Sequence, residues 1–413
     1  MDTPNPTTRV WPWALVAVGT IVRLLPLVLP FDFAGPDSIT YLEPARSLVA
    51  GLGYADGAGV PTALRPPGYP AFLAAVFAMG GNEFVVRLLQ ALLGGLSALA
   101  IYAILRRVSG RESWARIGGV LVALDPIAVG QSPFLLREAL LSGLLVGLIA
   151  ARILLSGRKR VLASALCLAA LALTHQLYAI LGGFLFLAEL WARGRRFRPR
   201  HLLPWVAMGL IVIWAVFLWA RRVERVTGQF SVSSSANAVP ARELYFSTAC
   251  PNLWLNGDPA TGFQQDAFME ERLIVDRLGV AEAKAVYYAR ARENWAAHPL
   301  RSFGRLALMN FWYWAEIPGS IRLAYHPRLH WLRWILLPIH WVRLACALAA
   351  LAFLLRSGAW RPYQSALAAL AFLALAPALL YPIPRYLGPA VPLLDLLAAV
   401  ALGREWERRR ASA

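Results

Sequence analysis

Charged side chains are scarce in this sequence. Asp, Glu, Lys and Arg make up only 15% of the 413 residues, whereas a soluble domain carries about 25%. Lysine is almost absent, since it occurs only at Lys159 and Lys284, and the net charge of +18 comes from arginine. Because 58% of the residues are hydrophobic, this scarcity excludes a water-soluble globular protein and predicts a polytopic membrane protein.

Cysteine is also scarce, and the common catalytic motifs are missing. The three cysteines, Cys167, Cys250 and Cys346, have no spacing typical of a metal knuckle or a disulfide framework. The chain has no HExxH helix, no Walker loop, no Gly-rich dinucleotide turn after a strand and no GxSxG elbow. None of the reactions that these motifs support is therefore indicated.

Long apolar runs fill most of the chain. About 20 apolar residues are needed to cross the hydrocarbon core of a bilayer. The first run, from Val10 to Leu29, has no small-residue cleavage site close behind it, so we interpret it as an uncleaved span. The predicted spans are 10–30, 84–105, 114–130, 135–155, 161–174, 177–192, 204–220, 333–355, 363–381 and 386–403. These runs predict an all-α polytopic membrane protein with about ten transmembrane helices.

Basic residues gather in the loops on one side of these spans. Loops 106–116, 152–160, 193–200, 356–361 and 404–410 hold nineteen Arg and Lys residues. The short loops on the other side (127–134, 174–177 and 381–386) hold only Arg385. The positive-inside rule then places both termini in the cytoplasm. The arginines have this topological role, so we expect no nucleic-acid partner.

Two longer segments remain on the outer side. The first is 31–83, and the second is 221–332, between spans seven and eight. The aromatic stretch 301–317 predicts a helix in the membrane interface, and 264–297 has the periodicity of two solvated helices. The chain therefore divides into an N-terminal transmembrane module (1–220), a small extracytoplasmic and interfacial segment (221–332) and a C-terminal transmembrane module (333–413).

Two carboxylates mark the predicted outer face. Asp37 follows the first span, and Glu138 opens the fourth. Each has a structural explanation as well: Asp37 as a helix cap and Glu138 as an acid that complements a helix dipole. Two acids at one depth are also what a general base or a cation site requires. We therefore consider a divalent cation as the one cofactor that these residues leave open.

Three cationic or titratable residues lie on the same face. Arg65 opens the irregular segment Arg65–Pro70, whose backbone is typical of a turn or of a polar cavity wall. Arg385 is not explained by the topology rule, although it could anchor to headgroups. His175, with Gln176, interrupts the apolar run 161–192, which is either a tight hairpin or a run whose middle is buried in protein; we favour the hairpin. A guanidinium suits a phosphate, so Arg65 and Arg385 are candidate phosphate ligands.

A metal site elsewhere is not indicated. His326 and His330 have helical spacing, but no acidic ligand is close to them in sequence. We therefore predict no dedicated metal ligands.

Four stretches, in this order, resemble the GT-C superfamily of membrane glycosyltransferases. They are Asp37–Ala45, Arg65–Leu73 with Arg87 and Gln90 following, Leu135–Leu140, and Pro384–Pro389. The chain is most similar to the branch that contains aminoarabinose transferase, protein O-mannosyltransferases and lipopolysaccharide-core galacturonosyltransferases. Each stretch alone is short, but together they span most of the chain.

The resemblance implies a glycosyltransferase that uses a polyprenyl-phosphate sugar on the extracytoplasmic face of the bacterial inner membrane. It implies that Asp37 is the general base and that Glu138 orients the acceptor or holds a cation. Many members have a second acid after the first, and Ser38 takes that place here. Arg65, Arg385 and His175 would bind the donor phosphate. The resemblance also makes Ser38, Tyr41, Tyr69 and Tyr386 candidate substrate contacts.

Physical reasoning agrees with this reaction. Nucleotide sugars stay in the cytoplasm, so an outer-face enzyme needs a donor that can be flipped across the bilayer. The acceptor is a glycan, lipid or protein hydroxyl, and the surroundings are membrane lipids. Two alternatives remain open: a lipid flippase or transporter, and a non-catalytic assembly protein. The absence of internal repeats argues against an inverted-repeat transporter.

Overall fold

The computed structural model describes residues 6–28, 33, 36–232, 282, 285–317, 331–378 and 384–412. Within these ranges the regular structure is helical, and the only strand-like pairing is an isolated bridge between Ala55 and Pro61. The all-α fold that the sequence predicts is therefore confirmed.

The elements follow one another with short connections. In chain order they are α1 (Pro6–Leu24), η1 (Leu25–Val28), α2 (Pro36–Val49), α3 (Gly68–Ala78), α4 (Glu83–Ser109), α5 (Glu112–Leu124), α6 (Pro126–Gln131), α7 (Glu138–Leu154), α8 (Gly157–Thr174), η2 (Gln176–Ile180), α9 (Leu181–Arg193), η3 (Gly194–Arg196), η4 (Pro199–His201), α10 (Leu202–Thr227), α13 (Pro299–Ala315), α15 (Leu332–Arg356), η6 (Arg361–Tyr363), α16 (Gln364–Ala378), η7 (Pro384–Ala390) and α17 (Val391–Ser412).

Over its described residues, each of the ten predicted spans coincides with helical structure. Among the described residues, seven helical stretches are long and apolar enough to cross a membrane: Val10–Val28, Glu83–Ser109, Glu112–Gln131, Gln176–Arg196, Pro199–Thr227, Trp334–Arg356 and Tyr386–Ala411. The other three coincide with α7 and α16, which are only 17 and 15 residues long, and with α8, whose first turn is basic. The protein is thus a multi-pass membrane protein, and the number of ten spans stays a prediction.

The predicted boundaries differ most at three helices, and the first of them, α17, continues to Ser412, beyond the predicted end at 403. The run 114–130 is broken at Asp125, because Pro126 cannot donate a backbone hydrogen bond to continue α5. The Asp125 carboxylate instead accepts a 2.6 Å hydrogen bond from the Ala128 amide and caps α6. The third difference is α10, which continues to Thr227, two turns beyond the predicted end at 220.

Helix α4 forms the centre of the N-terminal half. It packs against α1, α5 and α7, while α17 packs against α5 and α15. At the crossing of α1 and α4, a Cβ on Gly95 would lie only 2.5 Å from the carbonyl oxygen of Val16. Only glycine allows the two backbones to approach this closely, as is typical of membrane helix pairs.

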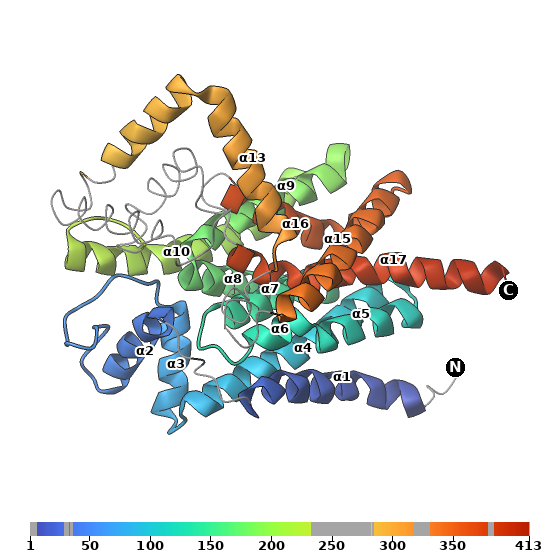
Figure 1. The fold of residues 1–413 in the computed structure, drawn as a ribbon, viewed down its shortest axis with the longest axis horizontal. Helices are drawn as coiled ribbons and strands as arrows, with labels where there is room; N and C mark the ends of the chain where they lie inside the picture. The colour runs from blue at the N-terminus through green and yellow to red at the C-terminus, as the bar shows by residue number, and fades with distance from the viewer. Residues whose placement is uncertain are drawn as a thin grey trace.

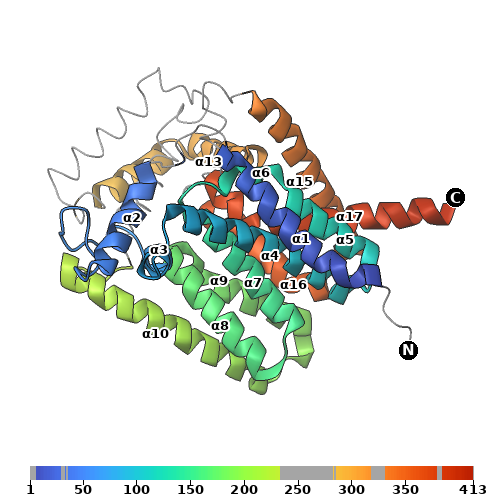
Figure 2. The ribbon, with the colours of Figure 1, turned by 90° about the horizontal axis from the view of Figure 1, so that it is seen from below.

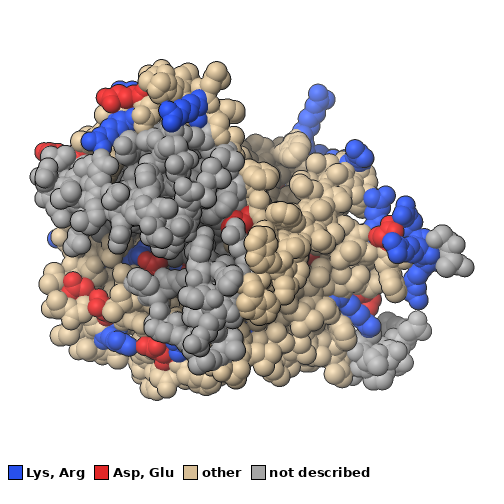
Figure 3. All heavy atoms as spheres, viewed as in Figure 1, with Lys and Arg blue, Asp and Glu red and all other residues tan. Residues whose placement is uncertain are grey.

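The two ends of the bundle differ in what they carry. Figures 1 and 2 show both termini at one end and α2 and α3 at the other. On the face drawn in Figure 3, the middle is mostly uncharged, and charged side chains gather towards the ends. This distribution suits a protein whose middle lies in hydrocarbon.

The second outer segment is described only in part. The predicted helix at 301–317 is present as α13, and residues 285–297 are helical as expected. The position of α13 in the membrane interface stays a prediction. The rest of 264–297, apart from 282, and the candidates His326 and His330 lie outside the described residues.

Candidate active site

Asp37 and Arg65 form an ion pair at the end of the bundle opposite the termini. Asp37 lies in the first turn of α2, and its Oδ1 is 3.0 Å from Nη2 of Arg65. The Arg65 Nε donates to the Thr40 hydroxyl at 3.1 Å, and the guanidinium lies 5.2 Å from the centre of the Tyr41 ring. The structure therefore brings the predicted base and a predicted phosphate ligand into direct contact.

The connection that carries Arg65 is tied to α10. The Tyr54 hydroxyl donates to the Arg65 carbonyl at 2.9 Å. Arg222 donates to the carbonyls of Thr62 and Tyr54, each at 2.6 Å, and its guanidinium lies 4.9 Å from the Tyr54 and Trp219 rings. Burial raises the pKa of Tyr54 well above its usual range, so its hydroxyl remains a donor. The sequence analysis did not predict this contact, because Arg222 lies beyond the predicted end of its span.

Gly68 brings α3 against the end of α8. A Cβ on this residue would lie 2.4 Å from the Thr174 hydroxyl and 2.8 Å from the Thr174 Cα. Since a backbone atom is among these neighbours, no side chain larger than hydrogen fits without a shift. The close approach places the first outer segment beside the break between Thr174 and Gln176, where His175 is buried.

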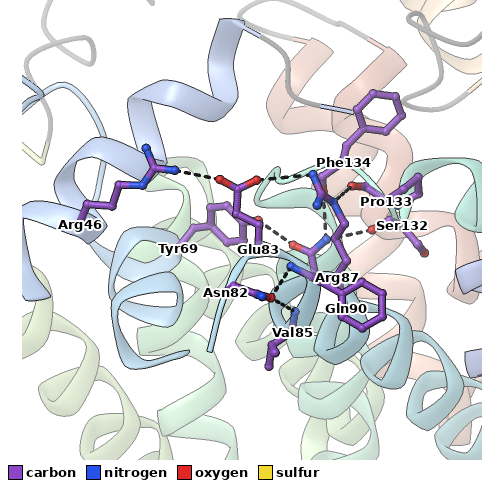
Figure 4. A network of polar contacts seen from close by, with 11 residues as sticks. Arg46, Tyr69, Asn82, Glu83, Val85, Arg87, Gln90, Ser132, Pro133 and Phe134 are labelled. Carbon is purple, nitrogen blue, oxygen red and sulfur yellow. Dashed lines mark hydrogen bonds and ion pairs between the residues drawn. The ribbon is translucent and has the colours of Figure 1, made fainter. Parts of the chain in front are cut away.

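A buried network fixes the loop that precedes Glu138 (Figure 4). The Tyr69 hydroxyl donates to Oε1 of Gln90 at 2.6 Å, and Nε2 of Gln90 donates to the carbonyls of Ser132 and Phe134, each at 2.9 Å. Arg87 donates through Nε to the Pro133 carbonyl at 3.0 Å.

This network gives Tyr69 and Gln90 a structural role. Burial, and then the charge of Glu138, raises the pKa of Tyr69 well above its usual range. Tyr69 and Gln90 therefore connect the first outer segment to the start of α7, the helix that Glu138 opens.

The predicted substrate contacts on α2 and α3 are buried. Ser38 and Tyr41 are each 1% exposed and Tyr69 is fully enclosed. The Tyr41 ring meets the Tyr69 ring edge-on, with centroids 5.2 Å apart. The Tyr41 hydroxyl has no hydrogen-bond partner within the described part of the chain. These three side chains thus form the layer beneath the Asp37–Arg65 pair.

Glu138, His175 and Tyr386 line one small cavity. Its volume is about 10 Å³, and Tyr178, Leu373 and Pro389 are among its other walls. A space of about this size holds a single water molecule. The His175 and Tyr386 rings meet edge-on at 5.4 Å. Arg385 is the second residue of η7, the 3₁₀ helix that also contains Tyr386, and its side chain lies outside the described part of the structure.

A buried charge network is the main feature that the sequence analysis missed. Arg343 contacts Asp125 and donates through Nε to Oδ1 of Asp395 at 2.8 Å. Arg23 donates to the carbonyls of Gly19, Val122 and Ala123.

All four of these charged residues lie inside predicted spans: Arg23, Asp125, Arg343 and Asp395. This position was the available signal, because charges within spans are costly and therefore candidates for function or packing. The network joins α1, α15 and α17 to the junction of α5 and α6.

The described residues hold no group of three His, Cys, Asp or Glu side chains that could bind a metal ion. Asp37 already faces a guanidinium, and Ser38 beside it offers no second carboxylate. Positive charge at this carboxylate is thus supplied by Arg65.

Comparisons with known proteins agree with this architecture. A sequence model of the family described as dolichyl-phosphate-mannose-protein mannosyltransferase matches residues 64–232. That range contains Arg65, Glu138 and His175 and excludes Asp37 and Arg385. No curated protein sequence matches the chain.

Solved structures extend the likeness to the whole chain. The oligosaccharyltransferase AglB from Archaeoglobus fulgidus, in complex with an inhibitory peptide and a dolichol-phosphate, is similar with a TM-score of 0.58 and 14% identity, over 98% of this chain and 51% of that one. The apo form of the Archaeoglobus fulgidus oligosaccharyltransferase gives 0.56 and 12%, with the same coverage. ArnT from Cupriavidus metallidurans bound to undecaprenyl phosphate gives 0.43 and 19%, over 95% and 78%.

This chain spans about half the length of the archaeal enzyme. The shared part is the fold, and it covers nearly every residue of the present chain. The chain therefore shares the membrane fold of the archaeal oligosaccharyltransferase, and its residues 64–232 match the mannosyltransferase family model.

Proposed function

We propose that the protein transfers a sugar from a polyprenyl-phosphate donor to an acceptor hydroxyl, with Asp37 as the general base. The observation that supports this proposal is the Asp37–Arg65 ion pair, in which a carboxylate lies 3.0 Å from a guanidinium. Transfer of a glycosyl group needs both, because a hydroxyl must lose its proton while a phosphate leaves.

Each side chain then has a definite task. The acceptor oxygen attacks the anomeric carbon and gives its proton to the Asp37 carboxylate. The bond between that carbon and the phosphate oxygen breaks, and the lipid phosphate leaves with the electron pair. Arg65, and Arg385 with His175, stabilise the phosphate charge, while Glu138 orients the acceptor. Tyr41 supports Arg65 from below, because the guanidinium lies 5.2 Å from the centre of its ring.

A large apolar groove supports a lipid-linked donor. It has a volume of about 870 Å³ and runs between α9, α15, α16 and α17, from Trp314 to Trp360. Its wall on α16 includes Leu370 and Ala374, and the adjacent Leu373 lines the small cavity with Glu138. We assign the groove to the isoprenoid tail, which would leave the phosphate at the end nearest Glu138. The archaeal oligosaccharyltransferase, which shares the fold, was solved with a dolichol-phosphate.

The site faces the extracytoplasmic side of a bacterial inner membrane in this proposal. Asp37 lies at the end opposite both termini, and the basic loops lie at the termini end (Figure 1). The positive-inside rule then places the termini in the cytoplasm. A flipped polyprenyl-phosphate sugar is the activated donor available on the outer side.

The test compares Asp37→Asn with the wild type in sugar release from a labelled polyprenyl-phosphate donor by purified protein. Asparagine keeps an oxygen that can accept from Arg65, so the fold should be retained, as thermal unfolding will show. We expect turnover to fall by about 10²–10⁴-fold, the range typical of a lost general base. Asp56→Asn is the matched control, because the Asp56 carboxylate accepts hydrogen bonds from the Ala58 and Val60 amides of its own turn and lies outside the proposed site.

Two results would contradict the proposal. An Asp37→Asn protein that is as active as the wild type would exclude Asp37 as the base. A wild-type protein that releases no sugar from several donors, yet moves labelled lipid between liposome leaflets, would replace the transferase by a flippase.

A further inference from the structure

A second polar pocket lies at the end of the bundle that carries both termini. Its volume is about 70 Å³, and it is enclosed by the last turns of α7 and α9, the first turns of α8 and α10, and η4. The charged and aromatic side chains that line it are Arg152, Arg160, Glu189, Arg193, Arg200, His201 and Trp205. We call it the Arg152 pocket.

Arg152 is the fixed inner wall of this pocket. Its side chain is only 7% exposed, and Nη2 lies 2.7 Å from Oε2 of Glu189. Nε donates to the Ser365 hydroxyl at 3.0 Å, and the guanidinium lies 4.5 Å from the centre of the Trp205 ring. Because Glu189, Ser365 and Trp205 all contact the buried Arg152 guanidinium, its orientation is fixed before any ligand binds.

Positive charge exceeds negative charge in the Arg152 pocket. Glu189 is its only carboxylate and is shared by two arginines, since Arg193 donates to its other oxygen at 3.0 Å. Arg160 and Arg200 also line the pocket, and neither has a hydrogen-bond or ion-pair partner among the residues that the structure describes. Four guanidinium groups beside one carboxylate favour an anionic ligand.

The helix ends add to this preference. The amino ends of α8 and α10 lie at the pocket, and an amino end favours an anion. The carboxyl ends of α7 and α9 lie there too, but Arg152 and Arg193 in their last turns offset those dipoles. The site is therefore electropositive from both its side chains and its backbone.

The pocket opens beside a surface suited to lipid chains. Val161 and Pro204 line it, and their neighbours Leu162 and Leu203 are 56% and 72% exposed. Only 6% of the most apolar window of Pro199–Thr227 is buried inside the protein. A volume of 70 Å³ also exceeds the 10–15 Å³ that one water requires by about fivefold, so a phosphate group fits.

We propose that the Arg152 pocket binds the phosphate group of an anionic phospholipid, with Arg160 and Arg200 as its mobile ligands. The acyl chains then lie along the apolar surfaces of α8 and α10. Basic pockets between helices at a membrane surface are suited to such headgroups. The site is separate from the proposed transfer reaction, because Asp37 lies at the opposite end of the bundle. A soluble phosphate would meet the same groups, so the experiment distinguishes the two sources.

Native mass spectrometry of the full chain in detergent tests this proposal. Phosphatidylglycerol or phosphatidylethanolamine is titrated onto the wild type and onto Arg160→Ala/Arg200→Ala. Each arginine next to an anionic headgroup contributes about fivefold in affinity. We therefore expect phosphatidylglycerol to bind about 25-fold more weakly to the double variant. Arg158→Ala/Arg195→Ala is the control, since it removes the same charge at exposed positions outside the pocket.

The possible results distinguish a lipid ligand, a soluble phosphate and the absence of an anion site. Loss of phosphatidylglycerol in the pocket variant but not in the control supports a lipid ligand. Stabilisation of the wild type by inorganic phosphate, absent in the pocket variant and without preference between the lipids, identifies a soluble phosphate source. Equal phosphatidylglycerol binding by wild type and pocket variant overturns the proposal.

Discussion

Removal of Arg343 should destabilise the protein more than any other single arginine substitution on α15. Its side chain is 6% exposed and contacts two carboxylates, those of Asp125 and Asp395, which are 2% and 3% exposed. In Arg343→Met both acids would remain buried without this partner. Breaking a buried ion pair from one side costs about 3–5 kcal/mol.

Interactions that remain in the variant reduce this cost. Asp125 would keep its hydrogen bond from the Ala128 amide, and the charge of Arg23 acts on Asp395. We therefore expect a loss near the lower bound, about 3 kcal/mol. Arg343→Met/Asp395→Leu should recover part of it, because one of the stranded carboxylates is then absent.

Equilibrium unfolding in mixed micelles and thermal unfolding measure the effect. Arg356→Met is the control, because Arg356 lies on the same helix but is exposed, and surface substitutions usually change stability by less than about 0.5 kcal/mol. An Arg343→Met protein within about 1 kcal/mol of the wild type, or a double variant less stable than the single one, would refute the argument that unpaired carboxylates cause the loss.

Two further substitutions test the active-site network and the groove. Tyr69→Phe removes the hydroxyl that donates to Gln90 at 2.6 Å and leaves a buried amide oxygen unsatisfied, so unfolding experiments should show a loss of about 1–3 kcal/mol; an unchanged stability would mean that Gln90 finds another donor. Ala371→Trp fills the apolar groove and should raise the KM for the lipid donor in the sugar-release assay, whereas Val342→Trp, on the exposed face of α15 that does not line the groove, should not. Equal KM values in these two variants would exclude the groove as the site of the lipid tail.

Local pattern was enough for the helices and for the order of the site residues. Apolar runs of membrane-crossing length gave each predicted span, because backbone hydrogen bonds in hydrocarbon must be satisfied within a helix. The breaks at Asp125 and His175 show the limit of this reasoning. The proline after Asp125 ends the helix by a local effect. The burial of the turn at His175 instead depends on the packing of α3 against Thr174, and α3 lies about 100 residues earlier in the sequence.

Residue type alone could not tell which polar groups would meet. The sequence predicted that Arg65 binds phosphate, and in the structure its guanidinium forms an ion pair with Asp37. It predicted that Tyr69 contacts substrate, and the Tyr69 hydroxyl donates a hydrogen bond to Gln90. Arg23, Asp125, Arg343 and Asp395 were overlooked because each is a single charge within an apolar run. Each charge alone would be unfavourable in the membrane, and only the packing of the helices brings the four side chains close enough to stabilise one another.

The sequence by itself determined that this protein is helical, crosses the membrane many times and carries Asp37, Arg65 and Glu138 at one end of its spans. These properties follow from composition, run length and charge placement, which act within about 20 residues of chain. Only the tertiary structure decided that Asp37 pairs with Arg65, that Glu138, His175 and Tyr386 share one cavity, and that Arg152 forms the wall of a cationic pocket. Such contacts join residues from separate helices, so they depend on how the helices pack and not on the sequence around any one residue.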